Sequence, residues 1–169
     1  MNKILGSWSA MRNYLEKDML CDSLKGRIRY YCTKYPNTDG FGVFEIVADG
    51  KIMKRFSMET VAKELKNKNP DMPENAFWKS FWEEKRSADL NDRREFDDEE
   101  FCEGLKLYRA LSIGDSLKSE NPVTRMFAIM DRRVGKRKLE ELKNTVLSEP
   151  EWLQEFYWLR MEAEKKGLS

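Results

Sequence analysis

A β-hairpin is predicted for Gly42-Val43-Phe44-Glu45-Ile46-Val47-Ala48-Asp49-Gly50-Lys51-Ile52-Met53-Lys54-Arg55-Phe56. Asp49-Gly50 separates two runs rich in aromatic and β-branched residues, and this dipeptide favours a type I′ turn because both central residues of that turn take a positive φ. Residues 27–35 have a similar composition, and residues 36–40 after them have the composition of a loop. We therefore expect a three-stranded antiparallel meander.

Helical periodicity flanks this sheet on both sides. Ser7 and the apolar residues after it, spaced three and four apart, predict a first helix to about Leu20. From Ser57 onward the pattern predicts about five helices, which open at Ser57, Pro73, Asp97 with Glu100, Asn121-Pro122 and Ser148-Glu149-Pro150. The helix that opens at Asn121 is expected to bend or break at Gly135. The expected fold class is α+β: an N-terminal helix, the meander, and a mainly helical C-terminal part.

Composition limits the architecture and the chemistry. The chain has 169 residues, of which 40% are hydrophobic and 36% charged, enough for one domain over residues 1–169. We expect residues 1–56 to form the first helix and the sheet, and residues 57–169 to form a helical part packed on them. The absence of histidine excludes Ser-His and Cys-His triads and His-ligated zinc or haem. The formal net charge of +1 excludes the strongly basic domain typical of a dedicated duplex-DNA binder.

The compartment can also be predicted from the sequence. We find no signal-peptide pattern and no run of about 18 to 20 apolar residues, so we expect a cytoplasmic protein without a membrane contact. The three cysteines, Cys21, Cys32 and Cys102, contain no C-x-x-C pair. We expect them to be small apolar side chains of the core.

Four stretches of the chain resemble an uncharacterised family of small bacterial cytoplasmic proteins. They are Trp8-Ser9-Ala10-Met11-Arg12, Cys21-Asp22-Ser23-Leu24-Lys25-Gly26-Arg27-Ile28-Arg29-Tyr30, Asn121-Pro122-Val123-Thr124-Arg125-Met126 with Asp131-Arg132-Arg133-Val134-Gly135-Lys136-Arg137, and Pro150-Glu151-Trp152-Leu153. Because they span nearly the whole chain, the resemblance implies one full-length domain. It also implies a cytoplasmic bacterial protein, and it brings no activity, cofactor or catalytic residue with it.

The densest basic run is a candidate anion-binding or nucleic-acid-binding site. On a continuous helix, Arg132 would lie one turn from Lys136, and Arg133 one turn from Arg137. Arginine matches phosphate and carboxylate with a planar fork of donors, so Arg133 and Arg137 are the better clamp. The alternative is a structural network or a solvated face, in which these cations pair with Asp131, Glu140 and Glu141.

The first strand is a second candidate for nucleic-acid binding. Its side chains alternate between two faces, and one face carries Arg27, Arg29, Tyr31, Thr33 and Tyr35. Alternating cations and aromatic rings suit single-stranded nucleic acid, because guanidinium groups bind phosphate and rings stack on bases. The neighbouring strands add Glu45, Lys51, Lys54 and Arg55, so the charge of the face is mixed. Ordinary β-propensity explains the tyrosines equally well.

Aromatic residues at 77, 78, 81 and 82 form a wide stripe on one predicted helix. Trp78 and Trp82 could anchor a partner protein. The preferred interpretation is that the stripe is core and joins the sheet to the helices, with Trp8, Trp152 and Trp158 as packing partners. The acidic run 97–100 is explained by the start of a helix rather than by Mg²⁺ binding, since consecutive helical residues point in different directions.

We interpret the chain as a non-enzymatic protein-interaction or regulatory module whose partner is another protein. A nucleic-acid-binding protein that uses the two basic segments is one alternative. A small histidine-free enzyme is the other, and it predicts a deep pocket with a carboxylate or lysine of strongly shifted pKa. No catalytic residue, metal ligand or cofactor is predicted, because neither an acid–base constellation nor a glycine-rich phosphate loop is recognisable.

Overall fold

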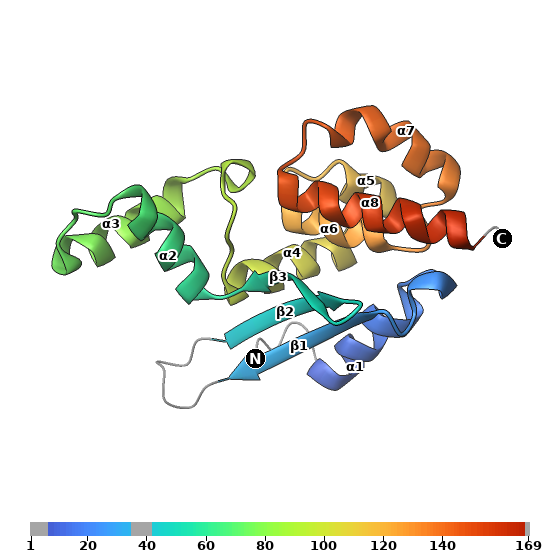
Figure 1. The fold of residues 1–169 in the computed structure, drawn as a ribbon, viewed down its shortest axis with the longest axis horizontal. Helices are drawn as coiled ribbons and strands as arrows, with labels where there is room; N and C mark the ends of the chain where they lie inside the picture. The colour runs from blue at the N-terminus through green and yellow to red at the C-terminus, as the bar shows by residue number, and fades with distance from the viewer. Residues whose placement is uncertain (1–6, 35–41, 168–169) are drawn as a thin grey trace.

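The computed structural model describes residues 7–34 and 42–167 and has the α+β architecture expected from the sequence (Figure 1). The N-terminal segment contains α1 (Trp8–Asn13), the π-helical turn η2 (Tyr14–Asp18) and the 3-10 turn η3 (Asp22–Leu24). The strands are β1 (Ile28–Lys34), β2 (Gly42–Ala48) and β3 (Lys51–Phe56). The later elements are α2 (Met58–Lys68), α3 (Glu74–Ser87), the 3-10 turn η4 (Leu90–Asp92), α4 (Asp98–Ala110), α5 (Ile113–Leu117), α6 (Pro122–Met130), α7 (Lys136–Val146) and α8 (Glu151–Lys166).

The three strands form the predicted antiparallel meander, in the order β1-β2-β3. In the register of the sheet, Ile46 of β2 is opposite Tyr30 of β1 and Lys54 of β3. Asp49 and Gly50 have φ values of 51° and 80°, so both residues of the connecting turn are left-handed, as the type I′ prediction requires. Tyr35 and the predicted loop at 36–40 lie outside the described residues.

Helices cover one face of the sheet. This inner face contributes Ile28, Tyr30, Phe44, Ile46 and Phe56 to the main core. Helix α4 packs on it, because the ring of Phe101 stacks on Phe44 with the centroids 4.2 Å apart. A Cβ on Gly104 would lie 2.5 Å from Cγ1 of Val123, so this glycine allows α4 to approach α6 closely. The main core therefore joins the sheet to the C-terminal helices.

The opposite face of β1 is open. Arg29, Tyr31 and Thr33 are exposed there, which confirms the predicted alternation along this strand. The sequence led us to expect the charge of Lys54 on this face as well, and that expectation is wrong. The Lys54 side chain lies on the inner side of β3 with Phe56 and is only 5% exposed.

The predicted helix starts are confirmed by their capping contacts. Ser57 Oγ accepts a hydrogen bond from the backbone N–H of Thr60 at the start of α2. Asp97 and Glu100 form the predicted capping box of α4, in which each side chain accepts a hydrogen bond from the backbone N–H of the other. Local sequence signals therefore place the first turns of these helices.

Between α6 and α7 the chain leaves the helical conformation. Residues 131–135 form turns, and α7 begins with Gly135 as its N-cap, so the predicted break is confirmed. The expectation that Arg132 and Arg133 lie on the same helix as the cations four residues later is wrong. The reason is local: the Asp131 carboxylate accepts a hydrogen bond from the backbone N–H of Arg133 at 2.8 Å, which favours a turn over a continued helix.

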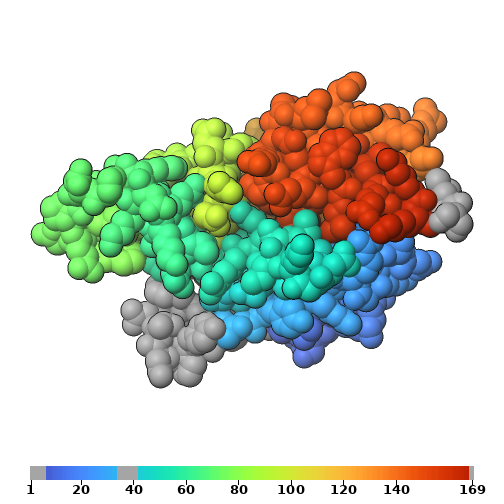
Figure 2. Space-filling model, viewed as in Figure 1, coloured from blue at the N-terminus to red at the C-terminus, as the bar shows by residue number. Residues whose placement is uncertain are grey.

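Helices α2 and α3 form a hairpin with a separate small core. This small core consists of Met58, Val61, Leu65, Phe77 and Phe81. The hairpin extends to one side of the molecule, away from α5, α7 and α8 (Figures 1 and 2). At its base, the backbone N–H of Ser57 donates to the carbonyl oxygen of Phe96 at 2.9 Å. The described residues therefore form two apolar clusters of unequal size.

Candidate functional site

The outer side of α3 carries two exposed tryptophans. Trp78 is 42% exposed and Trp82 is 37% exposed, whereas Phe77 and Phe81 of the same helix are buried in the small core. The rings of Phe81 and Trp82 meet edge to face with their centroids 5.1 Å apart. The buried phenylalanines therefore support an exposed pair of indole rings.

The core interpretation of this aromatic stripe is thus correct for its phenylalanines and wrong for its tryptophans. The expected packing partners are engaged elsewhere: Trp8 contacts Phe44, and Trp152 contacts Phe96. The stripe does not join the sheet to the helices because α2 supplies its apolar partners instead.

Two exposed cations lie beside Trp82 on the surface of α3, where the exposed Glu83 also follows Trp82 directly. Lys79 precedes it by three residues and Arg86 follows it by four, and these spacings make both side chains its neighbours on a helix. Both are exposed, and neither forms an ion pair within the described part of the chain. Lys85 Nζ lies 5.4 Å from the centre of the Trp82 ring. We call Trp78, Trp82, Lys79 and Arg86 the α3 surface.

The basic run after α6 consists mostly of paired cations. The ion pairs are Arg133 with Asp131 (2.7 Å), Lys136 with Glu140 (3.9 Å) and Arg137 with Glu141 (3.4 Å). Arg132 is exposed and forms no ion pair in residues 7–34 and 42–167. Arg133 thus belongs to a structural network, whereas Lys136 and Arg137 pair on a solvated face, and these are the two alternatives to an anion clamp that the sequence left open.

Asp131 is the centre of that network. Its carboxylate is 1% exposed and accepts hydrogen bonds from the hydroxyl of Tyr108 and from Nη2 of Arg133 at 2.7 Å. The hydroxyl oxygens of Tyr14 and Tyr108 are 3.2 Å apart. Burial raises the pKa of Asp131, but the hydrogen bonds from Arg133 and Tyr108 outweigh it and hold the pKa below its usual value. Arg133 is therefore committed to a buried carboxylate.

The cations beside the open face of β1 are also paired. Arg27 forms two hydrogen bonds with Asp49, at 2.9 and 2.8 Å, and Arg29 lies 3.2 Å from Glu16. Glu16 is buried and also accepts the backbone N–H of Tyr30 at 2.8 Å. These carboxylates neutralise the cations that a nucleic-acid backbone would need, which weighs against the nucleic-acid alternative.

A pocket lies between β3 and α8, at a position that the sequence did not indicate. Its volume is about 410 Å³, and it is lined by residues 52–55, by residues 91–95, by the start of α8 and by Thr60. Lys54 Nζ donates a hydrogen bond to the carbonyl oxygen of Arg94 and lies 3.8 Å from Glu95 Oε2. The centre of the Trp152 ring is 4.8 Å from the same nitrogen. We call this the Lys54 pocket.

The charge of Lys54 is weakened by its surroundings. Burial lowers the pKa of its amine to about 8, even though the carboxylates of Glu95, Glu64 and Glu155 favour the charged form. Arg94 lowers the pKa further. Roughly a tenth of the Lys54 side chains are therefore unprotonated near pH 7.

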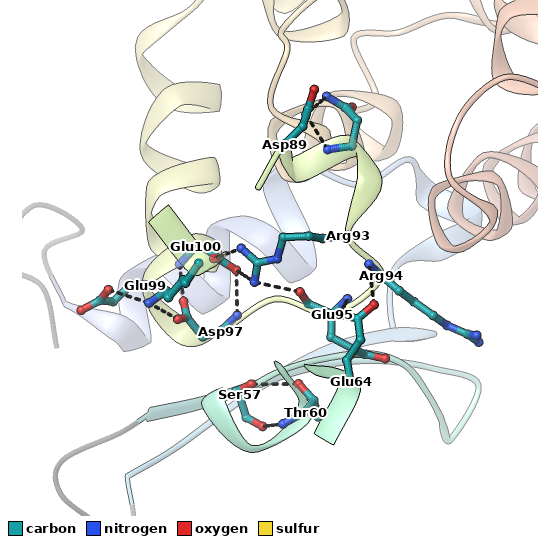
Figure 3. Close-up of polar contacts among 12 residues, drawn as sticks. Ser57, Thr60, Glu64, Asp89, Arg93, Arg94, Glu95, Asp97, Glu99 and Glu100 are labelled. Atoms are coloured by element: carbon teal, nitrogen blue, oxygen red, sulfur yellow. Dashed lines mark hydrogen bonds and ion pairs between the residues drawn. The ribbon is translucent and has the colours of Figure 1, made fainter. Parts of the chain in front are cut away.

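The wall of the pocket at residues 93–95 is held by neighbouring helices (Figure 3). Arg93 donates to Glu100 of α4 at 2.5 Å and to the carbonyl oxygen of Glu95 at 3.1 Å. Glu64 of α2 accepts the backbone N–H groups of Arg94 at 3.3 Å and of Glu95 at 3.2 Å. The carbonyl group that faces the Lys54 amine is therefore fixed from both sides.

One feature of the sequence indicates that the Lys54 side chain lies on the inner face of the sheet. The two-residue spacing of Lys54 from Phe56 places both side chains on the same face of a strand. Apart from Thr60, the parts of the pocket outside β3 lie more than 30 residues further along the chain, at 91–95 and at the start of α8. Spacing alone could not show that they meet Lys54.

The acidic run and the cysteines have structural roles. Lys85 pairs with Asp97 and lies 3.2 Å from Glu99, so part of the acidic run is neutralised at the start of α4. Cys102 is buried, and burial raises the pKa of its thiol to about 12. A thiol with this pKa is a weak nucleophile near neutral pH. Cys21 and Cys32 are half-buried.

Residues 7–161 match the family model of the SF0329 protein family. The chain belongs to the SF0329 protein family. Neither a curated protein nor a solved structure shows a significant match to it. The region that matches the SF0329 family model includes the small core, the α3 surface, the Lys54 pocket and all of the main core except Ala163.

Several polar residues in the stretches that carry this family resemblance hold distant segments together. Ser23 Oγ donates to the carbonyl oxygen of Ala163 at 2.8 Å. Arg125 Nη2 donates to Asn91 and Glu149, in each case at 2.7 Å. These contacts join segments that are far apart in the sequence. None of the helices among the described residues has the length and apolar character needed to cross a bilayer.

Proposed function

We propose that the protein is a protein-interaction module that binds its partner through the α3 surface. One observation carries this proposal: Trp78 and Trp82 are exposed on a helical hairpin while the phenylalanines behind them are buried. Tryptophan is the residue type most enriched among those that dominate binding energy, and exposed pairs on a supported helix make large rigid contacts.

The charges on the α3 surface indicate the chemistry of the partner. Lys79 and Arg86 flank Trp82 and form no ion pair among the described residues. By contrast, five of the six cations that the sequence suggested for nucleic-acid binding are paired, and these are Arg27, Arg29, Arg133, Lys136 and Arg137. The partner is an amphipathic protein segment whose apolar residues cover the indole rings and whose carboxylates meet Lys79 and Arg86.

Affinity purification from the native lysate, with nuclease treatment and at two salt concentrations, tests the proposal. The bait is compared with Trp78→Ala/Trp82→Ala and with Trp158→Ala, a control that removes a tryptophan of similar exposure (43%) from α8. We expect a protein partner that survives nuclease and whose affinity, measured with the purified pair, falls at least about tenfold in the double variant only.

Two outcomes would overturn the proposal. If no protein is retained after nuclease treatment, the α3 surface has no protein partner under these conditions. If a partner is retained equally well by the double variant, binding uses another surface. Recovery of RNA or DNA that is lost at the higher salt concentration would favour the nucleic-acid alternative instead.

A further inference from the structure

The Lys54 pocket combines an amine with groups that assist its chemistry. The rings of Phe96 and Trp152 lie 5.2 and 4.8 Å from Lys54 Nζ and exclude water from it. Glu95 Oε2, at 3.8 Å, supplies a carboxylate beside the amine. A buried amine beside a carboxylate and an aromatic ring, within a cavity whose other lining residues are mostly polar, has the components of sites in which lysine attacks a carbonyl group.

We propose that Lys54 forms a covalent imine with a small aldehyde or ketone that also carries an anionic group. The Nζ lone pair attacks the carbonyl carbon, and the proton released by the attacking amine passes to Glu95. The same carboxylate delivers this proton to the carbonyl oxygen, which becomes the hydroxyl group of a carbinolamine, and then carries the second Nζ proton to that hydroxyl group as it departs. The carbon–oxygen bond breaks, a carbon–nitrogen double bond forms, and one water molecule leaves, without any oxidant or reductant.

The electrostatics of the pocket support nucleophilic attack. Only an unprotonated amine attacks a carbonyl group, and burial lowers the pKa of Lys54 to about 8. The charged groups that act most strongly on Lys54 are Glu95, Glu64 of α2, Glu155 of α8 and Arg94. The three carboxylates favour the protonated amine, and Arg94 favours the unprotonated amine. At pH 7, Lys54 therefore has roughly 200-fold more of the reactive form than a lysine with the ordinary pKa of about 10.4.

Arg94 is the group that would bind the anionic part of the ligand. It lines the pocket and is exposed, and it forms no ion pair within the described residues. Of the other two arginines of the pocket, Arg93 pairs with Glu100 at 2.5 Å, and Arg55 Nε lies 3.5 Å from Glu45 without a hydrogen bond to it. Trp152 lines the same pocket, and its buried indole Nε1 has no hydrogen-bond partner among the described residues.

Reductive trapping on the intact protein tests this proposal. The protein is exposed briefly to glyoxylate and cyanoborohydride at pH 7, which converts an imine into a stable secondary amine, and the modified lysines are located by peptide mass mapping. We expect Lys54 to be modified first although it is 5% exposed. Lys51, exposed on the same strand, is the internal control.

A second aldehyde and one variant test the anionic part of the ligand. Glycolaldehyde has no carboxylate, so we expect Arg94→Ala to slow the labelling of Lys54 by glyoxylate about tenfold and to leave its labelling by glycolaldehyde within about twofold. Equal effects on both aldehydes would overturn the role of Arg94.

If the rate of labelling of each lysine follows its solvent exposure, so that Lys54 is modified no faster than Lys51, the proposed imine site is wrong. This result needs no variant at position 54, so it does not depend on whether such a variant folds. The Lys54 pocket and the α3 surface share no residue. Failure of one proposal therefore leaves the other unaffected.

Discussion

Asp131 connects three segments of the chain through one carboxylate. Tyr108 of α4 and Arg133 of the turn between α6 and α7 donate hydrogen bonds to it, and Tyr14 of η2 lies beside Tyr108. Because the carboxylate is 1% exposed, these donors replace the water that it loses on folding. Without the charge at Asp131, the tyrosine hydroxyl and the guanidinium would both lose a strong acceptor.

Asp131→Asn should lower the free energy of unfolding at pH 7 by about 2 to 4 kcal/mol. The native pKa of Asp131 is below that of the unfolded chain. The stabilisation by the Asp131 carboxylate is therefore complete at a pH above its unfolded-state pKa of about 3.9, and it is lost as the pH falls through its native-state pKa.

Urea unfolding between pH 3 and pH 7 measures this dependence. We expect the difference between wild type and variant to shrink below about pH 4, whereas the exposed Asp71→Asn should change little. A difference that is constant with pH would contradict this account.

The α2–α3 hairpin is the element with its own apolar cluster. Its five buried residues are far fewer than those of the main core, and polar contacts such as that between Lys85 and Asp97 attach it to α4. Elements with little buried apolar area open at a lower free energy than the rest of a domain. The hairpin should therefore be able to open while the main core stays folded.

Phe81→Ala and Phe127→Ala form a matched pair that tests this independence. Both phenylalanines are buried, Phe81 in the small core and Phe127 in the main core, and either change removes about 3 to 5 kcal/mol of packing. Hydrogen exchange should show faster exchange over residues 58–87 alone for Phe81→Ala, and over the whole molecule for Phe127→Ala. Equal acceleration in α6 and α8 by Phe81→Ala would show that the two clusters unfold together.

The elements that could be predicted from the sequence are those fixed by neighbouring residues. Asp49-Gly50 specifies its turn, and Asp97 with Glu100 specifies the start of α4, because the contacts that stabilise each lie within four residues. The break at Gly135 was also predictable, although the carboxylate of Asp131 that turns the chain there was not identified.

Features that depend on distant partners could not be predicted. The pattern of α3 marks Phe77 and Trp78 alike as apolar, and only the position of α2 decides that the first is buried and the second exposed. Lys54 is a similar case, because a lysine in a strand is ordinarily solvated and the aromatic wall that buries it comes from residues 96 and 152. The candidate sites therefore depended on tertiary packing more than the fold did.

At the scale of the whole molecule, the segment before the sheet packs against the C-terminal helices in the main core. The backbone N–H of Arg132 donates to the carbonyl oxygen of Met19 at 2.8 Å, and Ser23 contacts Ala163. The inner face of the sheet is covered by side chains such as Phe101. The N-terminal helix and sheet therefore have no complete apolar core without the C-terminal helices.

Fragments 1–56 and 57–169 should consequently each fail to fold alone and should fold when mixed. A three-stranded sheet is stable only when its apolar face is covered, and here the cover comes from the other fragment. Amide NMR spectra of each fragment and of the mixture measure this: we expect poorly dispersed spectra for the separate fragments and a dispersed spectrum after mixing. A dispersed spectrum for fragment 1–56 alone would show that the first helix and sheet form a domain of their own. In that case the contacts from Met19 and Ser23 to the C-terminal half would be an interface between two domains rather than part of one core.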